Sequence, residues 1–167
     1  MDDVTEHGGW PERIRELATG DVRRWQGLTG DCTRGDVEAA LGSGLADSDG
    51  VGFLDGSPTA FRGYPALGAT RGELVVWYVD DVAVLLRVPD YEPIVPLTEQ
   101  LGTPETTAPS LLRAFHTQWV YARRGLTAHV EDGTGAVSWL FGYPPTTPEE
   151  YLDSWLSRVE VHRIPRR

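Results

Sequence analysis

The chain passes through one series of landmarks twice, and this internal repetition constrains its fold more than any other feature. Each pass begins with a short helical segment that ends on Leu-Gly, at Leu41-Gly42 and at Leu101-Gly102. Each then reaches an Arg-Gly step, an apolar run, an acidic turn and a second apolar run. The acidic turns are Asp80-Asp81 and Glu131-Asp132. Two copies of one unit that share a core are therefore the predicted organisation.

The composition is that of a globular domain. With 167 residues, of which 40% are hydrophobic and 24% charged, the chain can bury one core across two half-sized units. The single cysteine, Cys32, excludes an internal disulfide framework, and we expect it to be a buried thiol. All fifteen basic residues are Arg, while Lys and Asn are absent. Because both missing residues have AT-rich codons, this usage indicates a high-GC bacterial genome.

The acidic balance limits the class of partner. The formal charge is −10 at pH 7, whereas a general nucleic-acid binder needs a basic surface that displaces counterions from phosphates. We therefore expect no nucleic-acid partner, and a protein partner would fit best if it were basic. The N-terminus lacks the basic and apolar regions of a secretory signal, and no run approaches the roughly 18 apolar residues that span a bilayer. A cytoplasmic protein without membrane contacts is expected.

Capping signals predict where the helices begin and end. A first helix opens at Trp10-Pro11, because proline is tolerated at the first helical position. A second begins at Thr33, has Asp36 at the third position and ends at Gly42. Thr147-Pro148 starts a last helix, whose apolar face continues at helical spacing through Tyr151, Leu152, Trp155, Leu156 and Val159.

Alternating segments predict three strands in each unit. In the first unit they are 59–64, 73–80 and 82–88, and in the second 114–122, 126–131 and 136–141. We expect loops at 43–58, at the Pro-rich linker 89–96 and in the Thr/Pro-rich stretch after Leu101. The predicted class is α+β, with helix-then-antiparallel-meander repeats forming one sheet in a single compact domain. Its parts are an N-terminal helical segment (1–30), repeat 1 (31–93), repeat 2 (94–146) and a C-terminal helix and tail (147–167).

The segment from Gly30 to Val37, followed by Leu41-Gly42, resembles a capped helix of the beta-lactamase-inhibitory-protein-like superfamily. Outer-membrane-assembly lipoproteins of the SmpA/OmlA type share that helix. The resemblance implies short helices that precede a small antiparallel sheet. In the inhibitory proteins the unit occurs in tandem and makes one continuous curved sheet. Their activity, which is to clamp another protein on the concave face, is what the resemblance implies for function.

The sequence holds no enzyme signature. It has no Walker loop, no G-x-S-x-G elbow and no H-E-x-x-H helix. We therefore expect no catalytic residues, no metal site and no cofactor.

Strand parity gathers polar residues on one face of the predicted sheet, because successive residues of a strand point to opposite faces. The opposite face carries Phe115 and the tryptophans Trp77, Trp119 and Trp139, which we expect to be largely buried. A register slip of one residue would move a strand's whole set to the other face. The candidate binding residues on the polar face are Tyr78, Arg87, His116, Gln118, His129 and Glu131.

Two interpretations of the polar face stay open. It is either a solvated face with scattered polar residues or a binding face with an apolar centre and a polar rim. An acid–base pair of His129 and Glu131 would lack the burial that tunes pKa values. We predict a protein-binding module, such as an inhibitor, an immunity-type protein or a regulatory partner, acting through an exposed sheet face. The alternative is a small-molecule binder or enzyme, which needs an apolar pocket of roughly 300 Å³ or more between sheet and helices.

Overall fold

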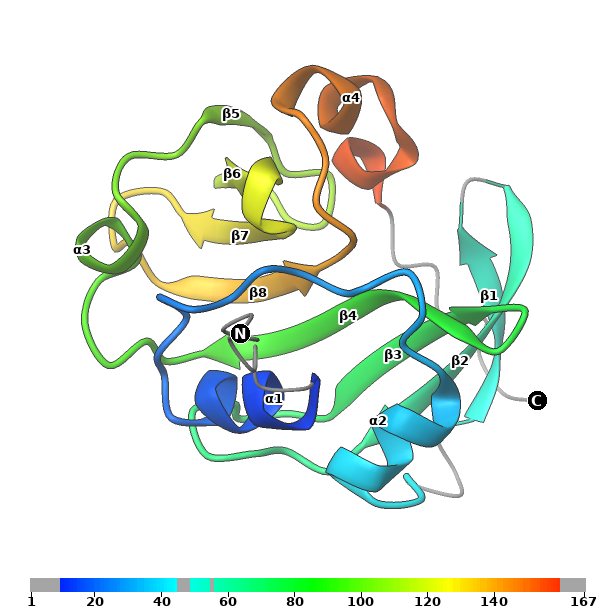
Figure 1. The fold of residues 1–167 in the computed structure, drawn as a ribbon. Helices are drawn as coiled ribbons and strands as arrows, with labels where there is room; N and C mark the ends of the chain where they lie inside the picture. Colours follow the sequence, from blue (N-terminus) through cyan, green and yellow to red (C-terminus); the bar gives the residue numbers. More distant parts are fainter. Residues whose placement is uncertain (1–9, 45–48, 55, 160–167) are drawn as a thin grey trace, which may run out of the picture.

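One antiparallel sheet organises the molecule (Figure 1). The computed structural model describes residues 10–44, 49–54 and 56–159. Its eight strands follow the order β1-β2-β3-β4-β8-β7-β6-β5, and every neighbouring pair is antiparallel. The predicted α+β class with antiparallel strands is therefore confirmed. The strands are β1 (Asp49–Leu54), β2 (Ser57–Tyr64), β3 (Leu74–Val79), β4 (Val82–Tyr91), β5 (Thr106–Pro109), β6 (His116–Tyr121), β7 (Leu126–Glu131) and β8 (Val137–Gly142).

Each half of the sheet is a meander of four strands, and β4 pairs with β8 where the halves meet. The prediction of three strands in each half is wrong, because β1 and β5 lie in segments that were expected to be loops. The glycines of β1 hid that strand, yet Gly52 is required: a Cβ there would lie 2.5 Å from the Trp77 ring. Strand β5 ends on Pro109 at the sheet edge, where proline needs no ladder partner.

The helices begin and end close to their predicted positions. Thr33 and Thr147 form the capping boxes of α2 and α4, and Gly42 and Gly102 end α2 and α3 at φ of 83° and 79°. The single long C-terminal helix is wrong, because Ser154 leaves the helix and its hydroxyl accepts a bond from the Leu156 amide. The helices are α1 (Trp10–Ala18), α2 (Arg34–Leu41), α3 (Leu97–Leu101), α4 (Pro148–Asp153) and the 3₁₀ turns η2 (Ala122–Arg124) and η3 (Trp155–Arg158).

None of the helices in the described part of the chain is long and apolar enough to cross a membrane.

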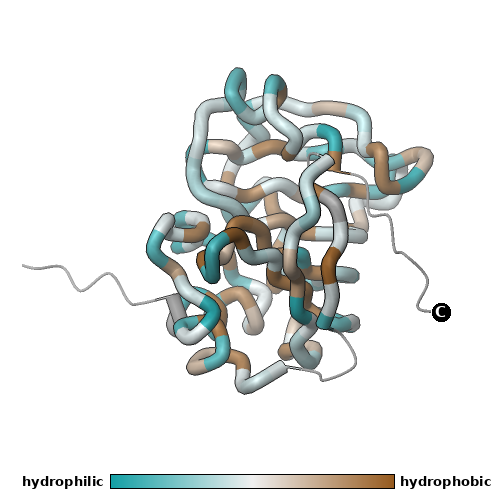
Figure 2. Tube along the Cα trace, turned by 90° about the vertical axis from the view of Figure 1, so that its right-hand side faces the viewer, coloured by the Kyte–Doolittle hydropathy of each residue, from teal (hydrophilic) through white to brown (hydrophobic). Residues whose placement is uncertain are grey.

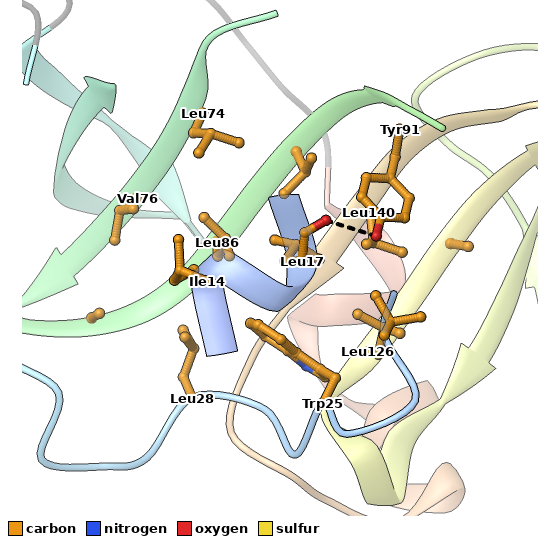
Figure 3. Packing of buried hydrophobic residues seen from close by; sticks show 14 of the residues in the cluster. Ile14, Leu17, Trp25, Leu28, Leu74, Val76, Leu86, Tyr91, Leu126 and Leu140 are labelled. Carbon is orange, nitrogen blue, oxygen red and sulfur yellow. Dashed lines mark hydrogen bonds between the residues drawn. The ribbon is translucent and has the colours of Figure 1, made fainter. Parts of the chain in front are cut away.

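The main core lies between the sheet and the N-terminal helices, on what we call the helix face. Ile14 and Leu17 of α1, with Trp25 and Leu28 of the following segment, pack against the sheet (Figure 3). The Tyr91 hydroxyl donates a hydrogen bond of 2.9 Å to the Leu17 carbonyl. Cys32 is buried here, as predicted, and burial raises the pKa of its thiol to about 12. Hydrophobic residues are concentrated in the middle of the molecule, and many outer turns are hydrophilic (Figure 2).

The opposite face of the sheet, which we call the outer face, is covered as well. Val75, Trp77, Leu85, Val120 and Phe141 form a second core with residues of the C-terminal segment, Tyr151 and Val159 among them. This segment, α4 and η3, lies beside the β5–β8 half (Figure 1). Both faces of the sheet are therefore buried over much of their area.

A β-bulge between β7 and β8 changes which face of the sheet Trp139 occupies, so this part of the prediction is wrong. His129 of β7 lies opposite Trp139, but Val130 lies opposite Val137, so Ser138 is an extra residue in β8. Trp139 therefore shares the outer face with the histidines instead of opposing them. Of the three tryptophans expected to be largely buried, Trp77 is buried, while Trp119 and Trp139 are half-buried.

Candidate functional site

One end of the sheet combines exposed apolar side chains with three connecting segments. Tyr91 of β4 lies opposite Val137 of β8, and Val130 of β7 lies opposite both Val137 and Thr117 of β6. This register brings segment 92–96, the β5–β6 loop 110–115 and the β7–β8 turn 132–136 to the same end, which we call the Phe115 end. Four of the seven exposed large hydrophobic residues in the described chain lie here: Ile94 (63% exposed), Val95 (38%), Leu111 (50%) and Phe115 (83%).

The backbone of Phe115 has a strained conformation, and a hydrogen bond from another turn fixes it in place. Its φ of 59° lies in the left-handed region, which costs a residue with a Cβ roughly 1–3 kcal/mol. The Phe115 carbonyl accepts a hydrogen bond of 2.8 Å from the Asp132 amide, and Asp132 in turn accepts one of 2.7 Å from the Thr117 hydroxyl. The ring is 83% exposed, so burial offsets little of the strain.

Acidic groups outnumber basic ones at the Phe115 end, and we call them the acidic rim. Asp90, Glu92, Glu131 and Asp132 belong to the connecting segments or lie next to them, as do Arg71 and Arg113. Arg71 forms a salt bridge with Glu92. Asp90, at the end of β4, also has a left-handed φ of 44°.

A serine–histidine pair lies at the same end, on the outer face. The His116 Nδ1 atom is 2.9 Å from the Ala114 carbonyl oxygen, and its Nε2 atom is 2.8 Å from the Ser138 hydroxyl. A carbonyl can only accept, so Nδ1 carries the proton of the neutral ring, and Nε2 accepts the hydroxyl proton of Ser138. His116 is buried, whereas Ser138 is half-exposed.

A second pair joins Ser110 to His129. The Ser110 hydroxyl oxygen accepts a bond of 3.2 Å from the Leu112 amide and lies 2.7 Å from His129 Nδ1. If the hydroxyl proton goes to Nδ1, His129 Nε2 carries the ring proton. This nitrogen is buried and has no hydrogen-bond partner within the described residues. Burial, and to a smaller degree the charge of His116, lowers the pKa of His129 to about 3, so the ring is neutral near pH 7.

The six predicted binding residues do not form one exposed face. His116, Gln118 and His129 share the outer face as predicted, but all three are buried. Gln118 donates to the Ser157 carbonyl (2.8 Å) and accepts from the Tyr151 hydroxyl (2.5 Å), which ties the C-terminal segment to β6. The expected exposure is therefore wrong, because α4 and η3 cover this part of the sheet.

The remaining three residues lie apart from one another. Tyr78 is on the helix face, where its hydroxyl is 2.6 Å from that of Tyr64 and burial raises its pKa. Arg87 is buried on the outer face, opposite Val75 and Phe141. Glu131 is half-buried at the Phe115 end and accepts a bond of 2.6 Å from the Thr134 hydroxyl.

Sequence reasoning missed the role of two loop residues. Ser110 lies in the Thr/Pro-rich stretch that was expected to be a loop, and no local pattern pairs it with His129. Phe115 was assigned to the buried aromatic face, but β6 begins one residue later, at His116. The nearby Gly133 and Gly135, both at positive φ, indicate a tight turn, yet nothing in the sequence places that turn against Phe115.

A surface groove of about 610 Å³ lies on the outside of α1, between its last turn and the segment that follows. Charged side chains dominate its lining. The Arg23 guanidinium donates three hydrogen bonds to the Asp21 carboxylate, and these, with a bond from the Arg23 backbone amide, lower the pKa of Asp21 to about 2. The groove is not between the sheet and the helices, where the small-molecule alternative needs a pocket. It is lined by Arg15, Glu16, Thr19, Asp21, Arg23 and Arg24.

Comparison with known proteins gives one distant likeness. No family model matches the chain, and no curated protein matches it. Among solved structures, the chain is similar to a DUF4309 family protein, YjgB, from Bacillus subtilis. The identity is 16%, the match covers 80% of this chain and 97% of that chain, and the TM-score is 0.40. A likeness this weak says nothing about function.

Proposed function

We propose that this protein is a protein-binding module whose partner docks on the Phe115 end of the sheet. The observation that carries the proposal is Phe115 itself, an aromatic ring that is 83% exposed on a left-handed backbone. Strained residues of this kind are concentrated at functional sites. An aromatic side chain has only two χ angles, so it loses little conformational entropy for the area that it buries in a pocket, which suits it to anchor an interface.

The charge of the rim selects the kind of partner. The acidic groups at the Phe115 end, in a protein of net charge −10, favour a partner with a basic surface around an apolar pocket. Complementary charge of this kind speeds association and is screened by salt. Binding should therefore weaken at about 1 M salt, where the Debye length is about 3 Å.

We also propose that the two halves of the sheet are copies of one unit. A glycine-terminated helix precedes each meander, since Gly42 ends α2 and Gly102 ends α3. Asp81 and Asp132 both lie in the turn between the third and fourth strand of their half. In an experimental structure, superposing 31–92 on 94–146 should place Gly42 on Gly102 and Asp81 near Asp132. A different strand path in the two segments would contradict the duplication.

The binding proposal is tested by parallel affinity capture from cells of the native organism. Wild-type protein, Phe115→Ala and Val79→Ala serve as baits; Val79 is the matched control because it is an exposed apolar residue outside the Phe115 end. We expect a basic protein that wild type and Val79→Ala retain and that Phe115→Ala loses, with Kd raised at least tenfold in a purified binding assay. Equal retention by all three baits would place the interface elsewhere. Purified protein that carries a bound metabolite and no partner would support the small-molecule alternative.

A further inference from the structure

We propose that Ser138 is the nucleophile of an acyl-transfer site, with His116 as its general base, acting on small uncharged esters. This inference is independent of the protein-binding proposal, because it rests on side chains other than Phe115. A nucleophile, a base and a group that orients the base are the required parts. Ser138, His116 and the Ala114 carbonyl supply them at 2.8 Å and 2.9 Å.

The hydrogen bonds set the base in the productive tautomer. The Ala114 carbonyl fixes the proton on His116 Nδ1, which leaves the Nε2 lone pair on the Ser138 hydroxyl. The half-buried Trp139 ring lies 6.3 Å from the His116 ring, centroid to centroid, and limits its movement. A backbone carbonyl here takes the orienting place that a carboxylate holds in a serine–histidine–aspartate triad.

The bulge in β8 positions the nucleophile. Ser138 is the residue without a partner in the register between β7 and β8, and the bulge turns its hydroxyl toward the outer face. Its partial exposure leaves the oxygen within reach of a small molecule, while the base stays buried. Half-buried apolar residues of the second core, Leu112 and Trp139 among them, lie on this face, so a short apolar acyl group fits better than a charged one.

We assign the donor for the developing negative charge to His129, on the strand in between. His129 lies on β7, between His116 on β6 and Ser138 on β8. Its Nε2 is buried and has no acceptor in the described structure. A neutral imidazole N–H in a water-poor place can stabilise an oxyanion without itself losing a proton.

The reaction balances without a further reagent except water. Ser138 Oγ forms a bond to the ester carbonyl carbon while its proton passes to His116 Nε2. The tetrahedral intermediate collapses, the carbon–alkoxide bond breaks, and the leaving oxygen takes the proton from Nε2 and departs as an alcohol. Water then attacks the acyl-serine in the same way, and the products are a carboxylic acid and free Ser138.

The test uses an alkyl fluorophosphonate, which phosphonylates activated serines, followed by intact-mass measurement and peptide mapping. We expect one adduct on Ser138 in wild type, none in Ser138→Ala, and a labelling rate lowered about 100-fold or more in His116→Gln, the usual scale of general-base help. Hydrolysis of p-nitrophenyl acetate should follow the same order. Ser57→Ala is the matched control, since Ser57 is an exposed serine of β2 in the other half of the sheet, and it should keep the Ser138 adduct.

Two outcomes would overturn the proposal: an unlabelled wild-type protein at millimolar probe, or an adduct mapped to another serine. Because the label is mapped in wild type, neither result depends on whether a variant folds. Partner capture and serine labelling are separate measurements on the wild-type protein, so failure of partner binding and failure of acylation are distinguishable.

Discussion

At position 115 the glycine variant should have a higher free energy of unfolding than the alanine variant, which is the reverse of the usual order. At an ordinary strand or loop position glycine is less stable than alanine by roughly 0.5–1 kcal/mol, because the unfolded chain gains freedom. At φ of 59° an alanine retains the left-handed strain of about 1–2 kcal/mol, which glycine does not experience. The strain relieved by glycine is about 1.5 kcal/mol, and the entropy cost of glycine is about 0.75 kcal/mol. Phe115→Gly should therefore be more stable than Phe115→Ala by about 0.75 kcal/mol.

Loss of the ring itself contributes little to either variant. The side chain is 83% exposed, so about a sixth of the 1.5–3 kcal/mol for full burial, roughly 0.3–0.5 kcal/mol, is lost in both. Phe115→Gly should therefore be close to wild type in free energy of unfolding, and Phe115→Ala should lie slightly below it. Both variants should lose the partner.

Urea denaturation measures the free energy of unfolding of each variant. In thermal denaturation the midpoint of the glycine variant should lie about 2–3 °C above that of the alanine variant. The matched control is Val51 of β1, which is also exposed and apolar and has no positive φ. At that position alanine should be the more stable substitution. If alanine is also more stable at position 115, the strain assigned to Phe115 is not present in solution.

Three further predictions concern the outer face. Gln118→Ala should lower the free energy of unfolding by about 2–4 kcal/mol, because it removes the amide donor of the Ser157 and Pro109 carbonyls and the acceptor that lies 2.5 Å from the Tyr151 hydroxyl; the exposed Gln26→Ala should change it by less than about 0.5 kcal/mol in the same urea titrations. Trp77→Ala should cost about 3–5 kcal/mol, and a loss below about 1 kcal/mol in urea would contradict its burial. The pKa of the His129 side chain is about 3 in the folded protein and 6.5 in the unfolded chain. As the pH falls below 6.5, the unfolded chain therefore takes up a proton that the folded protein does not. The contribution of His129 to the free energy of unfolding is fully present above pH 6.5 and is lost toward pH 3. Relative to pH 7, His129→Gln should remove about 2 kcal/mol of the destabilisation at pH 5, and an unchanged pH dependence would show that the ring is not buried as a neutral group.

The sequence alone was enough to place both ends of α2, the end of α3 and the start of α4, because capping chemistry is local. Thr33 and Asp36 are three residues apart and satisfy each other's backbone groups whatever the rest of the chain does. The positive φ of Gly42 and Gly102 likewise follows from the lack of a Cβ at the end of a helix. The parity of β6 and β7 was equally local, so the shared face of His116, Gln118 and His129 was predictable.

Only the tertiary structure decided where those faces lie and whether they are exposed. A bulge depends on how β8 meets β7, and one extra residue at Ser138 moves Trp139 to the other face. The burial of Gln118 depends on Tyr151, which is 33 residues away in the sequence and belongs to α4, the helix that covers this part of the sheet. The Phe115 carbonyl accepts a hydrogen bond from the Asp132 amide of a different turn, and no local pattern predicts that contact. Contacts between distant segments leave no periodic pattern in the sequence. Strand parity therefore predicted which side chains share a face, but only the packing of distant segments determined which of them are exposed to water.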